Sequence, residues 1–74
     1  MSPQETTSQR IGRCVREARR RDGIDQAKLA LIANVAVRSI HRVEKGEPTV
    51  RLDVLTRILS ALGLELEVRR RSGE

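Results

Sequence analysis

The fold of this chain is decided by one stretch, Val35-Ala36-Val37-Arg38-Ser39-Ile40-His41-Arg42-Val43-Glu44-Lys45-Gly46. As a helix, this stretch has a narrow apolar stripe that is made by Ile40 and Val43. The other side chains of its first two turns are polar or basic, namely Arg38, Ser39, His41 and Arg42. A short helix with so little apolar surface adds little to a core. We therefore expect other helices to hold it on one side, while its polar side meets a partner.

The chain before this stretch predicts an arm and a first helix. Residues 1–7 are polar and lack periodicity, so they are expected to form a flexible arm. The helix then runs to about Asp22, with Thr7 or Ser8 as its cap and Gly23 at its end. Its inward side chains follow helical spacing and are Ile11, Cys14, Val15 and Ala18.

A second short helix and a tight turn lead into the central stretch. Asp25 can cap a helix over residues 26–33. Asn34 tolerates the left-handed backbone conformation, so residues 34–36 can form a three-residue turn. The next helix covers residues 37–45. Two helices that are joined in this way form a helix-turn-helix unit.

A fourth helix over residues 52–62 carries the strongest apolar stripe, made by Leu52, Leu55, Ile58, Leu59 and Leu62. Residues 8–63 are thus expected to form one all-α domain with an aliphatic core. Cys14 is expected inside this core as a small apolar residue rather than as a reactive thiol. Leu31 and Ile32 either enlarge the core or form an apolar surface patch for a partner, and we expect them in the core.

The period of the sequence changes after Gly63. Alternation of apolar and acidic residues predicts a strand, and the proposed dimerisation strand comprises Leu64, Glu65, Leu66, Glu67, Val68 and Arg69. A lone strand leaves its backbone groups unpaired, so its expected partner is the same strand of a second copy. An antiparallel pair centred on Glu67 sets Glu65 opposite Arg69 of the second copy, at the cost of Glu67 facing itself. Centring on Leu66 sets Glu65 against Glu67, an unfavourable pair of like charges, so the first register is favoured. The alternative is an extended tail that packs on its own domain, and residues 70–74 are expected to be a flexible tail.

Composition and charge narrow the class of function. The 74 residues carry 15 Lys and Arg against 10 Asp and Glu, a net charge of +5 that favours a polyanionic partner. No Phe, Tyr or Trp is present, so stacking on unpaired bases is excluded. A single cysteine cannot form an internal disulfide, and no signal-peptide pattern opens the chain, so a reducing cytoplasm is expected. The sequence shows neither a metal-ligand spacing nor a glycine-rich phosphate loop, so we expect no cofactor and no enzymatic activity.

The polar side of the central helix suits the major groove of B-form DNA. In a helix-turn-helix, the second helix enters this groove and its N-terminal residues reach the edges of the bases. The candidate base-reading residues are Val37, Arg38, His41 and Arg42. Each arginine fork can grip guanine O6 and N7 with two hydrogen bonds. The candidate phosphate contacts are Gln26, Ser39, Lys45 and Arg51.

Two segments carry a resemblance to a known family. Residues 19–30 (RRRDGIDQAKLA) and residues 34–46 (NVAVRSIHRVEKG) resemble the XRE-type helix-turn-helix family of phage repressors and Cro-like regulators. Residues 47–68 (EPTVRLDVLTRILSALGLELEV) are similar to the HipB-type antitoxins. In these antitoxins a short C-terminal strand replaces the fifth helix and pairs across a homodimer. The resemblance implies a small lambda-repressor-like bundle of four helices, with one such strand.

The resemblance also implies roles for single residues. It places Gln26 and Ser39 on backbone phosphate, and it places Val37, Arg38 and Arg42 at the base-reading positions. It further implies an ion pair between Arg19 and Glu44, which agrees with their positions at the edges of the two inward helix faces. Two positions depart from the family pattern: Ala36 replaces a capping serine, and Asn34 replaces the usual turn glycine.

The expected function is that of a dimeric repressor of transcription. It would bind a palindromic operator in double-stranded DNA, repress its own operon, and bind a HipA-like kinase toxin as its antitoxin. One alternative is a generic XRE-type regulator without a toxin. The other is a protein-interaction adaptor that mainly neutralises a partner toxin, with Leu31, Ile32 and residues 69–71 among its candidate contact surfaces.

Overall fold

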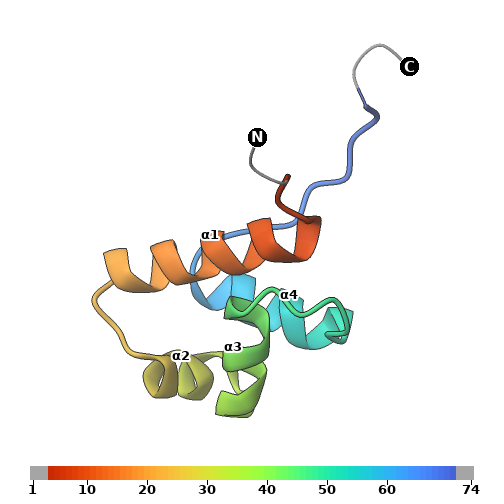
Figure 1. Ribbon diagram of the computed structural model, residues 1–74. Helices are drawn as coiled ribbons and strands as arrows, with labels where there is room; N and C mark the ends of the chain where they lie inside the picture. Colours follow the sequence, from red (N-terminus) through yellow and green to blue (C-terminus); the bar gives the residue numbers. More distant parts are fainter. Residues whose placement is uncertain (1–3, 72–74) are drawn as a thin grey trace.

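The structure of the chain is a computed structural model that describes residues 4–71. Within this range it contains four helices and no strand, and α1 lies across the other three (Figure 1). The helices are α1 (Thr7–Arg21), α2 (Gln26–Ala33), α3 (Val37–Glu44) and α4 (Leu52–Ala61). The expectation of an all-helical bundle of four helices is confirmed. The expected ends of the flexible arm and tail, residues 1–3 and 72–74, lie outside the described residues.

The first helix begins one position earlier than expected. Its cap is Thr6, rather than Thr7 or Ser8. The Thr6 hydroxyl accepts a hydrogen bond from the Gln9 amide at 3.1 Å, and the Gln9 side chain accepts one from the Thr6 amide at 2.9 Å. This capping box satisfies two backbone donors at once, because the Thr-x-x-Gln spacing lets each side chain accept a hydrogen bond from the backbone amide of the other residue. Glu5 is tied to α1 as well, through paired hydrogen bonds from Arg13 at 3.0 Å.

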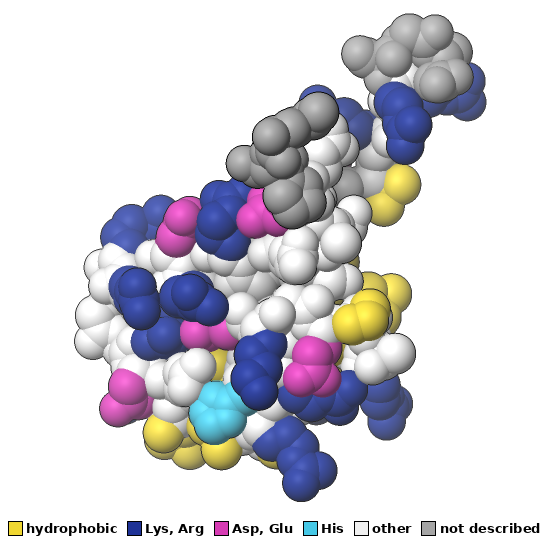
Figure 2. All heavy atoms as spheres, in the orientation of Figure 1, with side chains coloured by type: hydrophobic (Ala, Val, Ile, Leu, Met, Phe, Trp, Pro, Cys, Tyr) yellow, Lys and Arg dark blue, Asp and Glu magenta, His cyan; other side chains and the backbone are white. Residues whose placement is uncertain are grey.

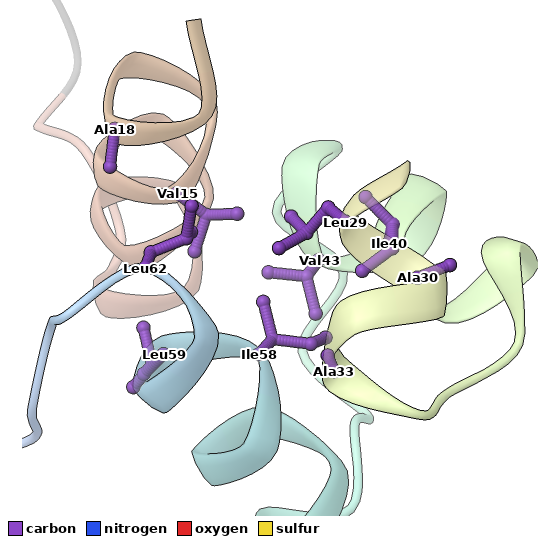
Figure 3. Close-up of a cluster of buried hydrophobic side chains, with 10 residues drawn as sticks. All are labelled: Val15, Ala18, Leu29, Ala30, Ala33, Ile40, Val43, Ile58, Leu59 and Leu62. Atoms are coloured by element: carbon purple, nitrogen blue, oxygen red, sulfur yellow. The ribbon is translucent and has the colours of Figure 1, made fainter. Parts of the chain in front are cut away.

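The core is aliphatic and lies between all four helices (Figure 3). Its largest fully buried side chains are Leu29, Ile40, Ile58 and Val15. Smaller or slightly more exposed members complete it, namely Ala18, Ala30, Ala33, Val43, Leu59 and Leu62. Every helix contributes to this one cluster, so α3 keeps its position only while the other three helices are packed behind it.

The buried face of α1 includes Gly12 and leaves Cys14 outside. Cys14 is exposed, so its expected place in the core is wrong. Gly12 is buried instead, and a Cβ atom built on it would lie 2.3 Å from the carbonyl oxygen of Val43. The backbones of α1 and α3 therefore approach too closely for any side chain at position 12. The helical spacing of apolar residues cannot reveal such an approach, because glycine has no side chain to place.

The expected core positions of three large apolar residues are also wrong. Leu31 and Ile32 are 74% and 51% exposed, and Leu52 is 66% exposed. On α2, the buried face is set by Leu29 and Ala33, which lie one turn apart. Leu31 and Ile32 lie on the other side of this eight-residue helix. Leu52 is the first residue of α4, before the helix reaches the core.

The turn between α2 and α3 is formed as the sequence predicts. Asp25 caps α2 by accepting a hydrogen bond from the Lys28 amide at 2.7 Å. Asn34 adopts the left-handed conformation with φ of 58°, which ends α2. Ala36 precedes α3 and makes no side-chain cap. Residues 34–36 therefore connect the two helices of the helix-turn-helix unit.

The C-terminal segment does not form the expected strand within the single chain. Leu64 is half-buried against the core, and its amide donates to the Leu59 carbonyl at 2.8 Å. Beyond it the segment leaves the bundle (Figure 1), and Leu66 and Val68 are 43% and 98% exposed. The alternative of a tail packed on its own domain therefore applies to Leu64 alone. A strand needs a second backbone for its ladder of hydrogen bonds, and one chain with a single such segment does not provide it.

Candidate nucleic-acid interface

The third helix has one buried face and one exposed face. Ile40, Val43 and Glu44 are buried, whereas Val37, Arg38, His41 and Lys45 at its end are exposed. Lys and Arg side chains gather on the face of the molecule where α3 lies, around the single histidine of the chain (Figure 2). The packing thus separates α3 into an apolar side and a polar, basic side, as its sequence predicts.

A buried carboxylate fixes the back of α3. Arg19 Nε donates to Glu44 Oε2 at 2.7 Å, and Arg19 Nη2 donates to Glu44 Oε1 at 3.0 Å. Gln26 Nε2 donates to Glu44 Oε1 at 3.1 Å, and Arg16 Nη2 donates to the Glu44 backbone carbonyl at 3.1 Å. These four residues, here called the Glu44 cluster, join α1, α2 and α3. The ion pair that the sequence proposes between Arg19 and Glu44 thus has two-point geometry, which is the strongest arrangement for such a pair.

Opposing effects act on the ionisation of Glu44. Burial raises the pKa of this carboxyl group. The hydrogen bonds from Arg19 and Gln26, with the charges of Arg19 and Arg16, outweigh burial and leave the pKa below its usual value. The Glu44 side chain is therefore a carboxylate at neutral pH, and the cluster holds α3 through charge-assisted hydrogen bonds.

A shallow basic depression lies beside the exposed face of α3. Its lining comprises Arg16, Arg19, Arg20, Gln26, His41, Glu44 and Lys45. Arg16, Arg20 and Lys45 are exposed at its surface, whereas Glu44 lies buried. Arg16 and Arg20 were not among the residues predicted to contact DNA. Their place beside α3 depends on how α1 crosses α3, and spacing along α1 alone does not show it.

The four predicted base-reading residues differ in exposure and in whether their side chains are already hydrogen-bonded within the chain. Val37 and Arg38 lie in the first turn of α3 and are exposed, and His41 lies one turn further on the same side. Arg38 has no hydrogen-bonding partner among residues 4–71. Arg42 is engaged: Nε donates to Glu47 Oε1 at 3.0 Å, and Nη2 donates to the Thr49 carbonyl at 2.6 Å. The structure therefore brings Val37, Arg38 and His41 to one accessible face, and it turns Arg42 toward the loop that follows α3.

The predicted phosphate-contacting residues surround this face. Gln26 uses one amide hydrogen for Glu44, and a second remains on the same nitrogen. Ser39 and Arg51 line a second shallow depression, between α3 and the start of α4. Arg51 is paired with Asp53 at 3.2 Å, and both side chains of this pair are largely exposed. Lys45 lies at the C-terminal end of α3 and is exposed.

A metal site and a membrane-spanning helix are two further features that bear on function. No group of three or more His, Cys, Asp or Glu side chains within residues 4–71 is placed to hold a metal ion. None of the described helices combines the length and the apolar character that crossing a membrane requires.

A short polar helix, joined by three residues to the helix before it and braced from behind, defines the class of helix-turn-helix proteins. The helix-turn-helix family model HTH_3 matches residues 15–68. The chain is 33% identical over 58 residues to "Uncharacterized HTH-type transcriptional regulator y4mF" of Sinorhizobium fredii (strain NBRC 101917 / NGR234). The matched segment covers 78% of this chain and 76% of that protein. A solved structure named "MDT Protein" has the same fold, with a TM-score of 0.78 and 17% identity over 93% of this chain and 97% of that chain. This chain therefore belongs to the HTH_3 helix-turn-helix family.

Proposed function

We propose that this protein is a transcriptional repressor that binds double-stranded DNA at specific sequences, and that it acts by binding rather than as an enzyme. The observation that carries this proposal is the two-sided α3. Its inner side is fixed by Ile40, Val43 and the Glu44 cluster, and its outer side presents the Arg38 fork, which no other side chain among residues 4–71 engages. A rigid helix with a polar outer face of this kind fits the major groove. The S. fredii relative that is named as a transcriptional regulator supports the same class of function.

Three residues are proposed to select the bases. The Arg38 fork can donate two hydrogen bonds to O6 and N7 of guanine, since no other side chain of the described chain engages it. Val37 is 41% exposed at the start of the helix and can contact a thymine methyl group. His41 lies one turn further and can donate to a base or to a phosphate.

Cations and hydrogen-bond donors on both sides of α3 are proposed to hold the DNA backbone. On one side these are Gln26, Lys45, Arg16 and Arg20, around the basic depression. On the other side these are Ser39 and Arg51. Contacts of this kind fix the position of a protein on DNA without selecting a sequence, and they make its affinity fall steeply with salt.

Selection of binding sites from a random pool of double-stranded DNA tests this function. The wild type should enrich one short motif, and Arg38→Ala should weaken binding to that motif by about 1–3 kcal/mol and relax one base position. Arg57→Ala is the matched control, because it removes the same charge from an exposed position on α4. The control should weaken binding slightly and equally for all sequences. A folded wild type that enriches no motif would contradict the proposal.

We further propose that the protein acts as a homodimer. The exposed alternation at residues 64–69 supports this, since a second copy would supply the missing backbone partner and cover Leu66 and Val68. Centring the pair on Glu67 sets Glu65 opposite Arg69 of the second copy. In the single chain Arg69 pairs with Glu67, an exposed pair that is weak enough to exchange. Two recognition helices about 34 Å apart would then bind the two halves of a palindromic operator.

The antitoxin role is the most specific form of the proposal. It is supported by the resemblance of residues 47–68 to HipB-type antitoxins, and it predicts a HipA-like kinase toxin as the partner. A kinase-like toxin encoded next to this protein, and isolated in complex with it, is the expected result. If the chain selects an operator but no such kinase accompanies it, it is a generic XRE-type regulator. If it binds a toxin and selects no operator, it is an adaptor, for which Leu31 and Ile32 are the exposed contact residues.

A further inference from the structure

The third helix ends in a motif that usually includes an apolar contact. Gly46 has a φ of 78°, its amide donates to the Val43 carbonyl at 2.9 Å, and the Glu47 amide donates to the Arg42 carbonyl at 3.1 Å. This pattern is the Schellman motif, in which the residue after the glycine commonly packs on the residue that accepts its amide hydrogen bond. At the end of α4 the same two positions are Leu59 and Leu64, both apolar.

At the end of α3 these two positions carry opposite charges. Arg42 Nε donates to Glu47 Oε1 at 3.0 Å, so an ion pair replaces the apolar contact. Arg42 Nη2 also donates to the Thr49 carbonyl at 2.6 Å and lies 3.2 Å from the Thr49 hydroxyl. The backbone and the side chain of Glu47 are thus both bound to the same residue of α3. We call Arg42, Glu47 and Thr49 the α3 latch.

The α3 latch changes what Arg42 can offer to DNA. Recognition of guanine by arginine needs two parallel N–H groups on one edge of the guanidinium. In Arg42 the edge between Nε and Nη2 is occupied, because Glu47 and Thr49 accept its hydrogen bonds. A guanine that binds this edge would have to displace a charged carboxylate and a carbonyl group together, and one that binds through Nη1 and Nη2 would have to displace the Thr49 hydroxyl from Nη2. No described side chain bonds to the guanidinium of Arg38, one turn earlier, so a guanine that binds it displaces no side chain of residues 4–71.

We propose that Glu47 and Thr49 withhold Arg42 from the bases, so that Glu47 is a specificity-determining residue that acts through Arg42. This inference rests on the proposed DNA-binding function. Arg42 is then a positioning residue that fixes the loop after α3, and base selection falls to Val37, Arg38 and His41. The inference differs from the expectation drawn from the family pattern, which places Arg42 at a base-reading position.

Selection from a random DNA pool with Arg42→Ala and Glu47→Ala tests the proposal. Arg42→Ala should enrich the wild-type motif, because the wild type does not use this side chain for bases. Glu47→Ala frees the fork, so it should gain a guanine preference of about fivefold or more at one position of the half-site. The double variant should lose that preference again. Glu17→Ala removes the same charge from an exposed position on α1 and should bind more tightly without a new preference.

Two results of the selection would overturn the proposal. One is a base preference of the wild type that disappears in Arg42→Ala while the rest of the motif remains. The other is a Glu47→Ala motif that is identical to the wild-type motif. Circular dichroism of each variant shows that it is folded, so a lost preference is not confused with unfolding.

A thermal double-mutant cycle tests the α3 latch without DNA. Arg42→Ala and Glu47→Ala should each lower the midpoint of unfolding by a few degrees, about 2–5 °C for a partly exposed pair in a domain of this size. The double variant should lower it no further than the larger single change. Additive shifts mean that the latch does not form and overturn the proposal. A folded wild type that selects no DNA instead overturns the DNA-binding function, and the cycle still shows whether the latch exists.

Discussion

At the scale of single residues, the buried Glu44 carboxylate ties α3 to the two helices before it. Its side chain is 4% exposed and that of Arg19 is 12% exposed. Three side chains from two other helices converge on this residue. A charge this far from water is tolerated only while its partners remain, since an unpaired buried charge is costly. The Glu44 cluster therefore makes the position of α3 depend on α1 and α2.

Arg19→Met should destabilise the fold by about 3–5 kcal/mol, because it leaves the Glu44 carboxylate buried without its main partner. Chemical denaturation with urea measures this loss. Arg10→Met is the matched control, since it makes the same change at an exposed position of the same helix and should change stability by less than about 0.5 kcal/mol. Equal losses for the two variants would show that the Glu44 cluster does not stabilise the fold.

The Glu44 cluster also predicts how stability depends on pH. The folded protein lowers the pKa of Glu44 below its ordinary value of 4.5, so folding favours the carboxylate. Its contribution is complete above about pH 4.5 and is lost as the pH falls through the lower pKa of the folded state. Glu44→Gln should therefore lose less stability than the wild type on acidification from about pH 5 to pH 2, as urea denaturation would measure.

Glu5→Gln is the control for this pH dependence. A hydrogen bond from Arg13 lowers the pKa of Glu5, but this pair lies on the surface, where water and salt weaken it. The acid dependence of Glu5→Gln should thus stay closer to that of the wild type. The opposite order of the two variants would assign the acid dependence to the surface pair.

Gly12 is expected to tolerate no side chain. Gly12→Ala improves helix propensity, yet its Cβ would lie 2.3 Å from the Val43 carbonyl oxygen. Because this contact is with backbone, α1 and α3 must separate, and we expect a loss of about 1–3 kcal/mol. Thermal unfolding measures it, with Cys14→Ala on the exposed side of the same helix as control. An unchanged or raised midpoint for Gly12→Ala would contradict the close helix contact.

At the scale of helices, α1 and α3 differ in how their first turns are satisfied. The start of α1 is closed by the reciprocal hydrogen bonds of Thr6 and Gln9. The start of α3 has no side-chain cap, because the methyl side chain of Ala36 has no atom that accepts a hydrogen bond. Helix α3 is thus held in place by tertiary contacts and by its C-terminal motif rather than by a cap on its first turn.

Ala36→Ser should stabilise the protein by about 1 kcal/mol, since the backbone at position 36 is extended and a serine hydroxyl there can accept from the first turn of α3. The midpoint of thermal unfolding should rise by about 4–8 °C for a domain of this size. Thr6→Ala makes the reverse change at α1 and should lower the midpoint. A serine that leaves the midpoint unchanged would show that the first turn of α3 is already satisfied.

At the scale of the whole molecule, the basic side chains around α3 lie apart from the exposed apolar side chains of the C-terminal segment. Cations surround the outer side of α3 (Figure 2), whereas the exposed apolar side chains of the C-terminal segment lie beyond the bundle. The surface proposed for DNA and the surface proposed for a second copy can therefore be occupied at the same time. This separation is what a dimeric binder of palindromic DNA requires.

Val68→Asp should abolish the dimer and leave the fold intact, because Val68 is 98% exposed in the single chain. Sedimentation should give a dimer mass for the wild type and a monomer mass for the variant, with unchanged helical content. Leu52→Asp is the control: it removes an apolar side chain that is 66% exposed at the start of α4, and it should remain dimeric. A dimer that survives Val68→Asp would exclude pairing through residues 64–69.

The four helices, the turn and the polar side of α3 can be predicted from the amino-acid sequence. These features depend on local properties. They are the helical spacing of apolar residues within each helix, such as Ile40 and Val43, the Asp25 cap, and the left-handed conformation at Asn34. The family resemblance implied the pairing of Arg19 with Glu44, and the positions of both residues at the edges of the inward helix faces agree with it. Local periodicity and capping are written within a few residues, so they can be inferred without the rest of the chain.

Which helix surfaces meet one another depends on the packing of the folded chain and could not be predicted from local patterns. The burial of Gly12 and the exposure of Cys14 depend on the line along which α1 crosses α3, and periodicity does not contain that line. The engagement of Arg42 by the loop after α3 depends on a backbone turn that brings Glu47 and Thr49 back to the helix. Residues 64–69 alternate like a strand, yet a strand requires the backbone of another segment. In each case the outcome depends on atoms outside the helical repeat of the residue itself, which lie in another helix, in the following loop or in the second backbone that a strand requires.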